Sequence, residues 1–324
     1  MVSSTSGVTV LIPGAINPRT LSRLETGFRL ERIASGDASL VTPQLARDVR
    51  GIAAFVPIRA AFIDALPKLE IVASFGVGYD AIDAKHCAAR GIMVTNTPDV
   101  LTEEVADTAI GLLINTVREL PKAEAWLRAG RWVKDGNYPL TRLSLRGRHV
   151  GIFGMGRIGR AIARRLEAMD LKVSYHNRRP VDDAHYDYYP SLVDLAKAVD
   201  TLICVAPGGA STEKAVNDRV LTMLGANGIF INIGRGSTVD EAALIAALQN
   251  GTIRAAGLDV FADEPRVPQA LIDLPNVSLL PHVGSASQHT RAAMADLVAD
   301  NLYGWFERGR ALTPVPETAG IKAS

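Results

Sequence analysis

Residues 148–161 read RHVGIFGMGRIGRA, in which the apolar run VGIF breaks into a turn with Gly154, Gly156 and Gly159. This pattern predicts a buried strand, a tight glycine turn and the first turn of a helix. In the spacing G-x-G-x-x-G, the first glycine makes the sharp turn, the second lets a pyrophosphate approach bare backbone, and the third allows close packing of helix on strand. The pyrophosphate would then lie at the helix N-terminus. Taken alone, the hexad also fits a purely structural turn.

Strand and helix signals alternate on both sides of this turn. After it, apolar runs predict strands at residues 172–175, 201–206, 228–233, 255–260 and 277–280. Before it, similar runs occur at residues 7–13, 51–56, 70–75 and 91–94. Because strands separated by helices form parallel sheets, both halves are predicted to be α/β. The glycine turn follows the first strand of a doubly wound sheet, which is the context that a dinucleotide site requires.

The length of the chain and the order of its segments predict two domains. A chain of 324 residues exceeds the usual size of one domain. A final amphipathic helix at residues 286–307 comes too late to belong to the nucleotide sheet, so we expect the C-terminus to return to the first domain. The predicted fold is α/β, with two Rossmann-like or flavodoxin-like domains of parallel sheet and an active-site cleft between them. Residues 1–98 plus 286–324 are expected to form the substrate-binding domain, and residues 99–285 the dinucleotide-binding domain.

Two helix starts carry capping signals. Thr102 precedes two glutamates and is predicted to be the N-cap of a helix that continues to about Leu120. Thr238 and Glu241 have the spacing of a capping box, which predicts a helix that closes at Gly251.

The composition is that of an ordinary globular protein, with 48% hydrophobic residues, 21% charged residues and a formal net charge of +1. This balance gives no electrostatic reason to expect nucleic acid or an anionic membrane as a partner. Cys87 and Cys204 lack metal-ligand spacing, so buried free thiols and no metal are expected. The N-terminal stretch has no basic region before its apolar run, and no run of about 18 apolar residues occurs. These features favour a cytoplasmic location.

Residues 118–146 differ from the rest of the chain. Trp126, Trp132, Tyr138 and Leu140 are spread among charged residues and glycines, without a clear strand pattern. Large apolar side chains need a surface to cover, which a second copy of the chain would provide. The alternative is that this segment folds back on its own chain.

The end of the second strand of this sheet, the strand at residues 172–175, indicates which nucleotide is bound. An acidic residue about 20 positions after the hexad would bind the ribose diol of NAD. Here the chain reads Asn177, Arg178 and Arg179, and guanidinium groups attract a 2′-phosphate. NADP(H) is therefore favoured over NAD(H). A solvated basic turn is the alternative, and the nearby Asp182 and Asp183 keep NAD(H) possible.

Three predicted strands run into polar residues just beyond their carboxyl ends. INIGRG contains Arg235, GLDVFADEP contains Glu264, and LLPHVGSA contains His282. Because the carboxyl ends of parallel strands share one edge with the glycine turn, these residues are expected to converge where a nicotinamide would lie. Each also has an ordinary interpretation: a turn cation, a surface carboxylate and a core histidine.

Together these residue types suit the reduction of a 2-oxo acid. Arg235 offers a planar fork for a carboxylate and the adjacent carbonyl. His282 would be the general acid in reduction and the base in oxidation, and Glu264 would orient the imidazole and favour its protonated form. Asp259 could hold the nicotinamide carboxamide. Across the expected cleft, the run from Ser74 to Gly78 leaves backbone N–H groups for a small carboxylate.

These motifs in this order resemble the D-isomer-specific 2-hydroxyacid dehydrogenase family over essentially the whole chain. Residues 73–80, residues 96–102 and Asn177-Arg-Arg are similar to the glyoxylate/hydroxypyruvate reductase branch, which prefers NADPH. The resemblance implies that Arg235, Glu264 and His282 are catalytic, that Val77 and Gly78 bind substrate through their backbone, and that a homodimer forms through residues 118–146. The motif and the resemblance together give as cofactor contacts Thr108, Gly154, Met155, Gly156, Arg157, Ile158, Gly159, Asn177, Arg178, Arg179, Val205, Ala206, Pro207, Ile233, Gly234, Asp259 and Gly284.

The favoured function is therefore an NADPH-dependent reductase of small 2-oxo acids, which converts glyoxylate to glycolate and hydroxypyruvate to D-glycerate. One alternative is a 2-hydroxyacid dehydrogenase for a bulkier acid such as 2-ketogluconate or an aryl pyruvate, because Gly76 departs from the commoner family pattern and could alter the pocket. Another is a non-catalytic scaffold that senses dinucleotides, although the intact set of Arg235, Glu264 and His282 counts against it.

Overall fold

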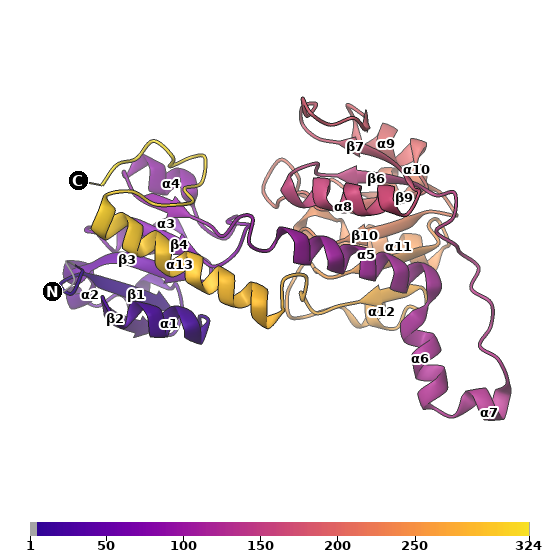
Figure 1. The fold of residues 1–324 in the computed structure, drawn as a ribbon, viewed down its shortest axis with the longest axis horizontal. Coiled ribbons are helices and arrows are strands. Elements are labelled where there is room, and N and C mark those ends of the chain that lie inside the picture. Colours follow the sequence, from indigo (N-terminus) through magenta and orange to yellow (C-terminus); the bar gives the residue numbers. More distant parts are fainter. Residues whose placement is uncertain (1–4, 324) are drawn as a thin grey trace. The chain divides into compact units, whose positions relative to one another are not determined.

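The chain folds into two compact α/β units, each built on its own parallel sheet (Figure 1). The computed structural model describes residues 5–323. Unit 1 comprises Met1–Leu101 and Ser287–Ser324, and unit 2 comprises Thr102–Ala286. The boundaries that the sequence predicts, at residues 99 and 286, lie close to these limits. The prediction of an α/β fold with two parallel sheets is confirmed.

Unit 1 contains a five-stranded sheet in the order β2-β1-β3-β4-β5. Its strands are β1 (Thr9–Pro13), β2 (Arg29–Ile33), β3 (Val49–Ala54), β4 (Ile71–Ser74) and β5 (Met93–Thr95). Its helices are α1 (Pro18–Leu24), α2 (Pro43–Asp48), α3 (Ala60–Asp64), α4 (Ala84–Ala89) and α13 (Gln288–Arg308), with a 3₁₀ turn at Ala38–Leu40. One face of the sheet packs its apolar side chains on α2, α3 and α4. On the other face α13 packs against β3 and β4, and α1 packs against α13.

Unit 2 contains a seven-stranded sheet in the order β12-β11-β10-β9-β6-β7-β8. Its strands are β6 (His149–Phe153), β7 (Lys172–His176), β8 (Asp187–Tyr188), β9 (Thr201–Cys204), β10 (Ile229–Asn232), β11 (Ala255–Leu258) and β12 (Val277–Leu279). Its helices are α5 (Thr102–Arg118), α6 (Leu120–Arg128), α7 (Arg131–Asp135), α8 (Arg157–Ala168), α9 (Leu192–Ala198), α10 (Asp218–Leu224), α11 (Glu241–Gln249) and α12 (Gln269–Ile272), with a 3₁₀ turn at Gly236–Thr238.

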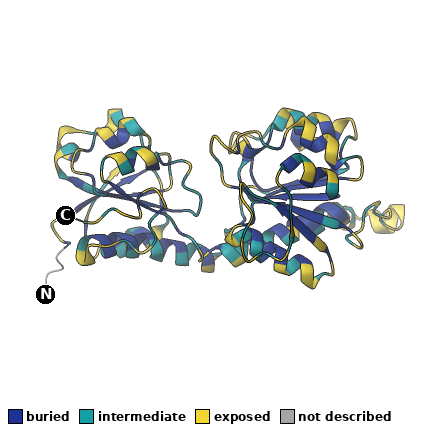
Figure 2. Ribbon diagram, turned by 90° about the horizontal axis from the view of Figure 1, so that it is seen from above, coloured by how far each residue is buried: buried dark blue, intermediate teal, exposed yellow. Residues whose placement is uncertain are grey.

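Helices cover both faces of the sheet of unit 2, and the strands between them are buried (Figure 2). α5 packs on α8 and on β10, β11 and β12, while α9, α10 and α11 form the main apolar core of the opposite face. The strand order reverses beside β6, because α8 carries the chain from β6 to β7 on one side and the chain later returns to β9 on the other. In open α/β sheets, ligands bind at the carboxyl ends of the strands at such a switch point.

Several local predictions were wrong. β2 was not predicted because an edge strand need not be apolar, and its sequence RLERI contains only exposed and half-buried residues. β8, α1, α4, α6 and α7 were also not predicted. Thr102 does not cap α5: it is the first helical residue, and its buried hydroxyl has no hydrogen-bond partner within residues 5–323. The N-cap of α11 is Asp240, which accepts from the N–H of Ala243, so the capping box of Thr238 and Glu241 does not form.

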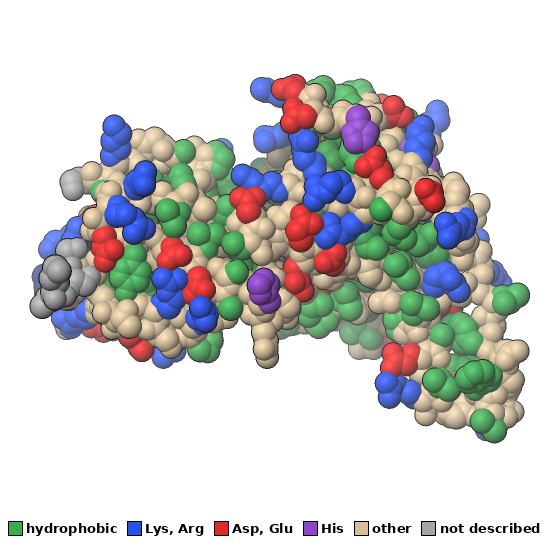
Figure 3. All heavy atoms as spheres, viewed as in Figure 1, with side chains coloured by type: hydrophobic (Ala, Val, Ile, Leu, Met, Phe, Trp, Pro, Cys, Tyr) green, Lys and Arg blue, Asp and Glu red, His purple; other side chains and the backbone are tan. Residues whose placement is uncertain are grey.

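The surface carries both signs of charge in close mixture. On the face that Figure 3 shows, basic and acidic side chains alternate over both units, and apolar side chains gather over α6 and α7. Within residues 5–323, no helix has the length and apolar character needed to cross a membrane. Cys87 and Cys204 are buried free thiols, as predicted.

Candidate active site

The glycine turn after β6 has the packing that its spacing predicts. Gly154 has φ +108°, and a Cβ there would lie 2.8 Å from the backbone nitrogen of Ala206. A Cβ on Gly159 would overlap the carbonyl oxygen of Gly154, whereas one on Gly156 would meet no atom within 4 Å. The first and third glycines therefore permit close packing inside the protein, while the second leaves open space at the N-terminus of α8. This open, side-chain-free surface fits a pyrophosphate.

The loop after β7 carries the residues predicted to select the nucleotide. The amide oxygen of Asn177 accepts from the N–H of Met155 at 2.7 Å, so Asn177 holds the glycine turn. Arg178 and Arg179 are exposed, and neither forms a hydrogen bond or ion pair with any residue between 5 and 323. Asp183 lies 3.7 Å from Arg160. The two guanidinium groups are thus available to an anion beside the glycine turn.

Other predicted cofactor residues lie on α5 and in the turns after β9, β10 and β12. The hydroxyl of Thr108 donates to the carbonyl of Gly284 at 3.2 Å. A Cβ on Gly234 would lie 2.7 Å from the carbonyl oxygen of Ala206, so the turn after β10 packs against the turn after β9. A Cβ on Gly284 would lie 3.5 Å from the side chain of Ile233. The turn after β9 therefore lies against both the glycine turn and the turn after β10. The remaining residues predicted to contact the cofactor, Arg157, Ile158, Val205 and Pro207, lie in or beside the same turns.

Asp259 holds the turn that carries His282. Its buried carboxylate accepts from the N–H of Val283 at 2.7 Å and from the N–H of Gly284 at 2.9 Å, and its carbonyl accepts from the N–H of His282 at 2.8 Å. These three bonds keep His282 in the left-handed region, at φ +52°, where non-glycine residues are strained. Burial raises the pKa of Asp259, and the two N–H donors offset this only in part. Strain of this kind persists only where the surrounding structure enforces it.

His282 and Glu264 form a hydrogen-bonded pair. The Nδ1 of His282 lies 2.6 Å from the Oε2 of Glu264. The other carboxylate oxygen of Glu264 accepts from the N–H of Phe261 at 3.0 Å, so both oxygens are engaged. Because Nδ1 is bonded to a carboxylate, it carries a proton, and Nε2 is the nitrogen left to exchange a proton with a ligand. About half of the imidazole is exposed.

The loop that carries Glu264 is anchored from a neighbouring turn. Glu241, at the start of α11, accepts from the N–H of Ala262 at 3.2 Å. A Cβ on Gly236 would collide with the backbone of Phe261, so the 3₁₀ turn after β10 lies directly against this loop. The predicted capping box assigns Glu241 to the helix start, but in the structure its carboxylate holds the loop that carries Glu264. Residues that hold a functional pair in this way limit its rotation.

The electrostatics of the pair favour an ionised carboxylate. Partial burial acts to raise the pKa of Glu264, but the hydrogen bonds from His282 and from the N–H of Phe261, together with the charge of Arg235, lower it below its ordinary value. An ionised carboxylate beside an imidazole orients the ring and stabilises its positive charge.

Arg235 follows β10, and its guanidinium group donates to the carbonyl of Gly234 at 2.8 Å. The main chain of Arg235 is held by two neighbouring side chains. The side-chain amide of Asn232 donates to the carbonyl of Arg235 at 3.0 Å and accepts from the N–H of Gly234 at 3.0 Å. The hydroxyl of Thr238 donates to the same carbonyl at 2.6 Å. Asn232 is buried and was missed by the sequence analysis, although a polar residue at the end of an apolar strand was a usable signal. The positive charge of Arg235 acts to lower the pKa of Glu264.

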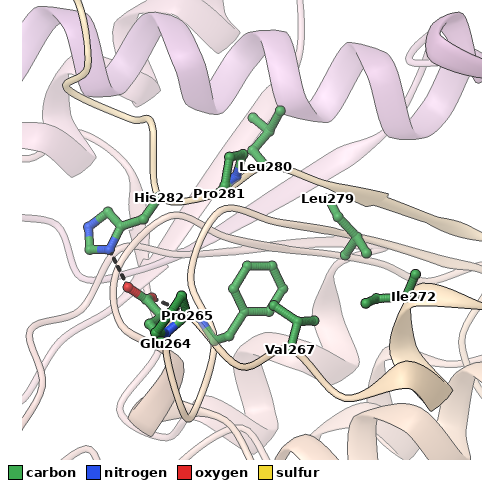
Figure 4. Close-up of a pocket in the computed structure, with 9 residues that line it drawn as sticks. Glu264, Pro265, Val267, Ile272, Leu279, Leu280, Pro281 and His282 are labelled. Atoms are coloured by element: carbon green, nitrogen blue, oxygen red, sulfur yellow. Dashed lines mark hydrogen bonds and ion pairs between the residues drawn. The ribbon is translucent and has the colours of Figure 1, made fainter.

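An apolar pocket of about 290 Å³ adjoins the pair. Figure 4 shows the ring of His282 facing the carboxylate of Glu264, with Val267, Ile272 and Leu279 farther along the same wall. The residues come from the loop after β11, from α12 and from β12. The pair therefore lies where apolar surface meets the polar carboxyl edge of the sheet.

Val77 and Gly78, predicted to bind substrate, lie in unit 1 in the loop that follows β4. The amide nitrogen of Asn96 donates to the carbonyl of Val77 at 2.7 Å. The N–H of Thr97 donates to the carbonyl of Gly76 at 2.8 Å. No local sequence signal indicates this role for Asn96.

Comparison with known proteins identifies relatives of the whole chain. Residues 110–284 match the family model described as D-isomer specific 2-hydroxyacid dehydrogenase, NAD binding domain. Glyoxylate/hydroxypyruvate reductase A of Arabidopsis thaliana is 46% identical over 297 residues, which cover 91% of this chain and 94% of the relative. Hydroxyphenylpyruvate reductase of Plectranthus scutellarioides is 49% identical over 256 residues, covering 79% and 81%.

A solved structure is similar over almost the full length. The crystal structure of an NADPH-dependent glyoxylate/hydroxypyruvate reductase from Sinorhizobium meliloti, in complex with NADP and malonate, superposes with a TM-score of 0.95. The two chains are 63% identical, and the match covers 97% of this chain and 98% of that one.

Proposed function

Because the chain belongs to the D-isomer specific 2-hydroxyacid dehydrogenase family, we propose that it is an NADPH-dependent reductase that converts glyoxylate to glycolate and hydroxypyruvate to D-glycerate. The observation that carries the proposal is the bonded pair of His282 and Glu264, 2.6 Å apart, on the sheet whose first strand runs into the glycine turn. The activities of the Arabidopsis and Sinorhizobium relatives support the choice of substrates.

The chain's own residues provide a fit for NADP(H). The open space at Gly156 receives the pyrophosphate, and Arg178 and Arg179 bind the 2′-phosphate. When bound, the cofactor supplies the hydride. Asp259 and the turn it holds would position the nicotinamide end, because its carboxylate fixes the backbone of Val283 and Gly284 and its carbonyl that of His282.

His282 transfers the proton. In reduction, its Nε2 donates a proton to the carbonyl oxygen of the 2-oxo acid as that oxygen gains negative charge, and in the reverse direction it accepts one. Glu264 keeps Nδ1 protonated and compensates the charge of the imidazolium. Glu241 and the N–H of Phe261 keep Glu264 in place.

Arg235 binds the substrate carboxylate and polarises the neighbouring carbonyl. A guanidinium offers parallel N–H donors to two oxygens, which fixes the orientation of a small 2-oxo acid. In unit 1, the N–H groups of Val77 and Gly78 are donors suited to a small carboxylate.

A bulkier 2-oxo acid is the second candidate substrate. The 49% identical relative from Plectranthus is a hydroxyphenylpyruvate reductase, and a 2-ketogluconate reductase of Gluconobacter oxydans is 40% identical over 92% of this chain. A Cβ on Gly76 would meet only the carbonyl oxygen of Gly78, at 3.4 Å, so the glycine leaves room in the loop beside Val77.

A homodimer through residues 118–146 completes the proposal. Leu127 and Trp132 are 54% and 59% exposed, and Val133 and Leu140 are 97% and 96% exposed. Arg131 lies over the ring of Trp126 and Tyr138 bonds to Glu119, so this segment has an ordered surface that a second copy would bury. The two free thiols fit a reducing, cytoplasmic environment.

Initial rates test the function. The purified protein is assayed with glyoxylate, hydroxypyruvate, 4-hydroxyphenylpyruvate and 2-ketogluconate, each with NADPH and with NADH. We expect the highest kcat/KM for glyoxylate or hydroxypyruvate with NADPH. A higher value for an aryl or sugar acid would favour the second candidate, and binding of NADPH without any turnover would favour a sensing scaffold.

The variant Arg178→Ala tests the proposed contact with the 2′-phosphate of NADPH. Loss of one charge-assisted contact to the 2′-phosphate should raise the KM for NADPH by about tenfold and change that for NADH by less than about twofold. Equal changes in the KM for NADPH and in the KM for NADH would show that Arg178 does not bind the 2′-phosphate.

A further inference from the structure

The loop after β4 is held by two successive carbonyl groups. The N–H of Thr97 donates to the carbonyl of Gly76 at 2.8 Å, and the side-chain amide of Asn96 donates to the carbonyl of Val77 at 2.7 Å. Asn96 and Thr97 directly follow β5, which is the strand next to β4. Both anchors therefore approach the loop from the same neighbouring segment.

Because the peptide bond is planar, these two hydrogen bonds also fix the direction of the N–H groups of Val77 and Gly78. In a trans peptide, the C=O and the following N–H point in opposite directions. The bonds after Gly76 and Val77 are trans. The N–H groups of Val77 and Gly78 consequently point away from Asn96 and Thr97, and within residues 5–323 neither has a hydrogen-bond partner. Adjacent N–H groups on one side of a loop form an anion-binding surface.

Asn96 is itself fixed by the C-terminal segment of the chain. The hydroxyl of Thr313 donates to the carbonyl of Asn96 at 2.7 Å, and that hydroxyl accepts from the side-chain amide of Asn301 at 2.8 Å. Asn301 lies fully buried on α13, and its amide oxygen accepts from the N–H groups of Leu312 and Thr313. A continuous chain of hydrogen bonds thus leads from the core of unit 1 to the loop.

We propose that Asn96 is a positioning residue for the reaction, which aims the N–H groups of Val77 and Gly78 at the substrate carboxylate and is held in place by Thr313 and Asn301. The proposal rests on the proposed function of this loop. Asn96 acts through the loop and touches no reacting atom. An asparagine suits the task because its amide donates to a carbonyl, whereas the isosteric carboxylate of aspartate would repel it.

The proposal predicts a selective effect on substrate binding. Asn96→Ala and Asn96→Asp should each raise the KM for glyoxylate by about tenfold, since a misdirected N–H loses a bond to a charged group. The KM for NADPH should stay within about twofold of the wild-type value, because the predicted cofactor contacts lie in unit 2. Asn250→Asp, at an exposed position, is the control for the added charge and should match the wild type.

Thr313 provides a second pair of variants that keeps Asn96 intact. Thr313→Ser retains the hydroxyl, so its KM for glyoxylate should stay near that of the wild type. Thr313→Val removes the hydrogen bond to the carbonyl of Asn96 and should raise the KM for glyoxylate about threefold. Thermal unfolding of every variant is measured in parallel to show that each is folded.

The outcomes separate this proposal from the proposed function. Wild-type reduction of glyoxylate together with an unchanged KM in the Asn96 variants would overturn the positioning role alone. Parallel rises in the KM for glyoxylate and for NADPH, with a lowered Tm, would also overturn it, because a general structural defect would then explain the effect. A wild-type protein that reduces no 2-oxo acid would remove the proposed function as well.

Discussion

The two sheets use the same architecture but offer different chemistry at their carboxyl edges. Unit 2 presents ionisable side chains there, with Arg235 after β10, Glu264 after β11 and His282 after β12. Unit 1 presents main-chain N–H groups at Val77 and Gly78, aimed by carbonyl anchors on the other side of the same peptides. One edge is suited to moving a proton, and the other to holding a small anion.

This difference determines what substitutions should do. A functional side chain is lost when its residue is replaced, but a backbone N–H survives almost any substitution except proline. In unit 2 the sensitive positions are therefore the functional residues themselves. In unit 1 the sensitive positions are the neighbours that orient the backbone.

The largest expected effect is at His282. His282→Ala removes the proton donor and should lower kcat by a factor of about 10² or more, the usual contribution of a general acid. NADPH should still bind, which is measured by quenching of protein fluorescence or by calorimetry. A variant that turns over at the wild-type rate would remove the side-chain mechanism of unit 2.

Glu264→Gln should have a smaller effect, about tenfold in kcat, because the amide keeps the ring oriented but no longer compensates its charge. Glu213→Gln, at an exposed position, is the control for the removed charge. A loss as large as that in His282→Ala would mean that Glu264 takes part in the chemistry directly.

The same substitution should change the pH dependence of stability. The pKa of Glu264 is lowered in the folded state from its ordinary value of 4.5, so its contribution to the free energy of unfolding is present above pH 4.5 and is lost as the pH falls through the lowered pKa. Since one third of the side chain is exposed, the contribution is on the order of 1 kcal/mol or less. Urea unfolding of wild type and Glu264→Gln should differ most near neutral pH and converge in acid. A difference that grows in acid would contradict the sign.

The smallest expected effect is at Val77 in unit 1, where the backbone rather than the side chain is proposed to bind the substrate. Val77→Ala keeps the N–H and both carbonyl anchors, so kcat/KM for glyoxylate should fall by less than about threefold. A loss of tenfold or more, measured by initial rates, would mean that the side chain of Val77 rather than its backbone contacts the substrate.

Much of this site could be predicted because its signals are local. The glycine spacing, the polar residues after three apolar strands and the Arg178-Arg179 pair are visible in short windows of sequence, and strand topology implies that they share an edge. The supporting residues could not be found in this way. Glu241 fits a capping box equally well, and only the approach of Ala262 to its carboxylate shows a different role. Asn96 and Thr313 are more than 200 positions apart, and no local pattern links them.

The sequence by itself determined the α/β class, the dinucleotide turn and the residue types available for hydride and proton transfer, because glycine spacing and hydrophobic periodicity act over a few residues. The tertiary structure alone decided which groups those residues bond. His282 is held at φ +52° by Asp259, Glu264 is fixed from two loops, and the N–H groups of unit 1 receive their direction from a segment near the C-terminus. Hydrogen bonds between distant segments form only after the apolar faces have packed, so their partners cannot be assigned before the fold is known.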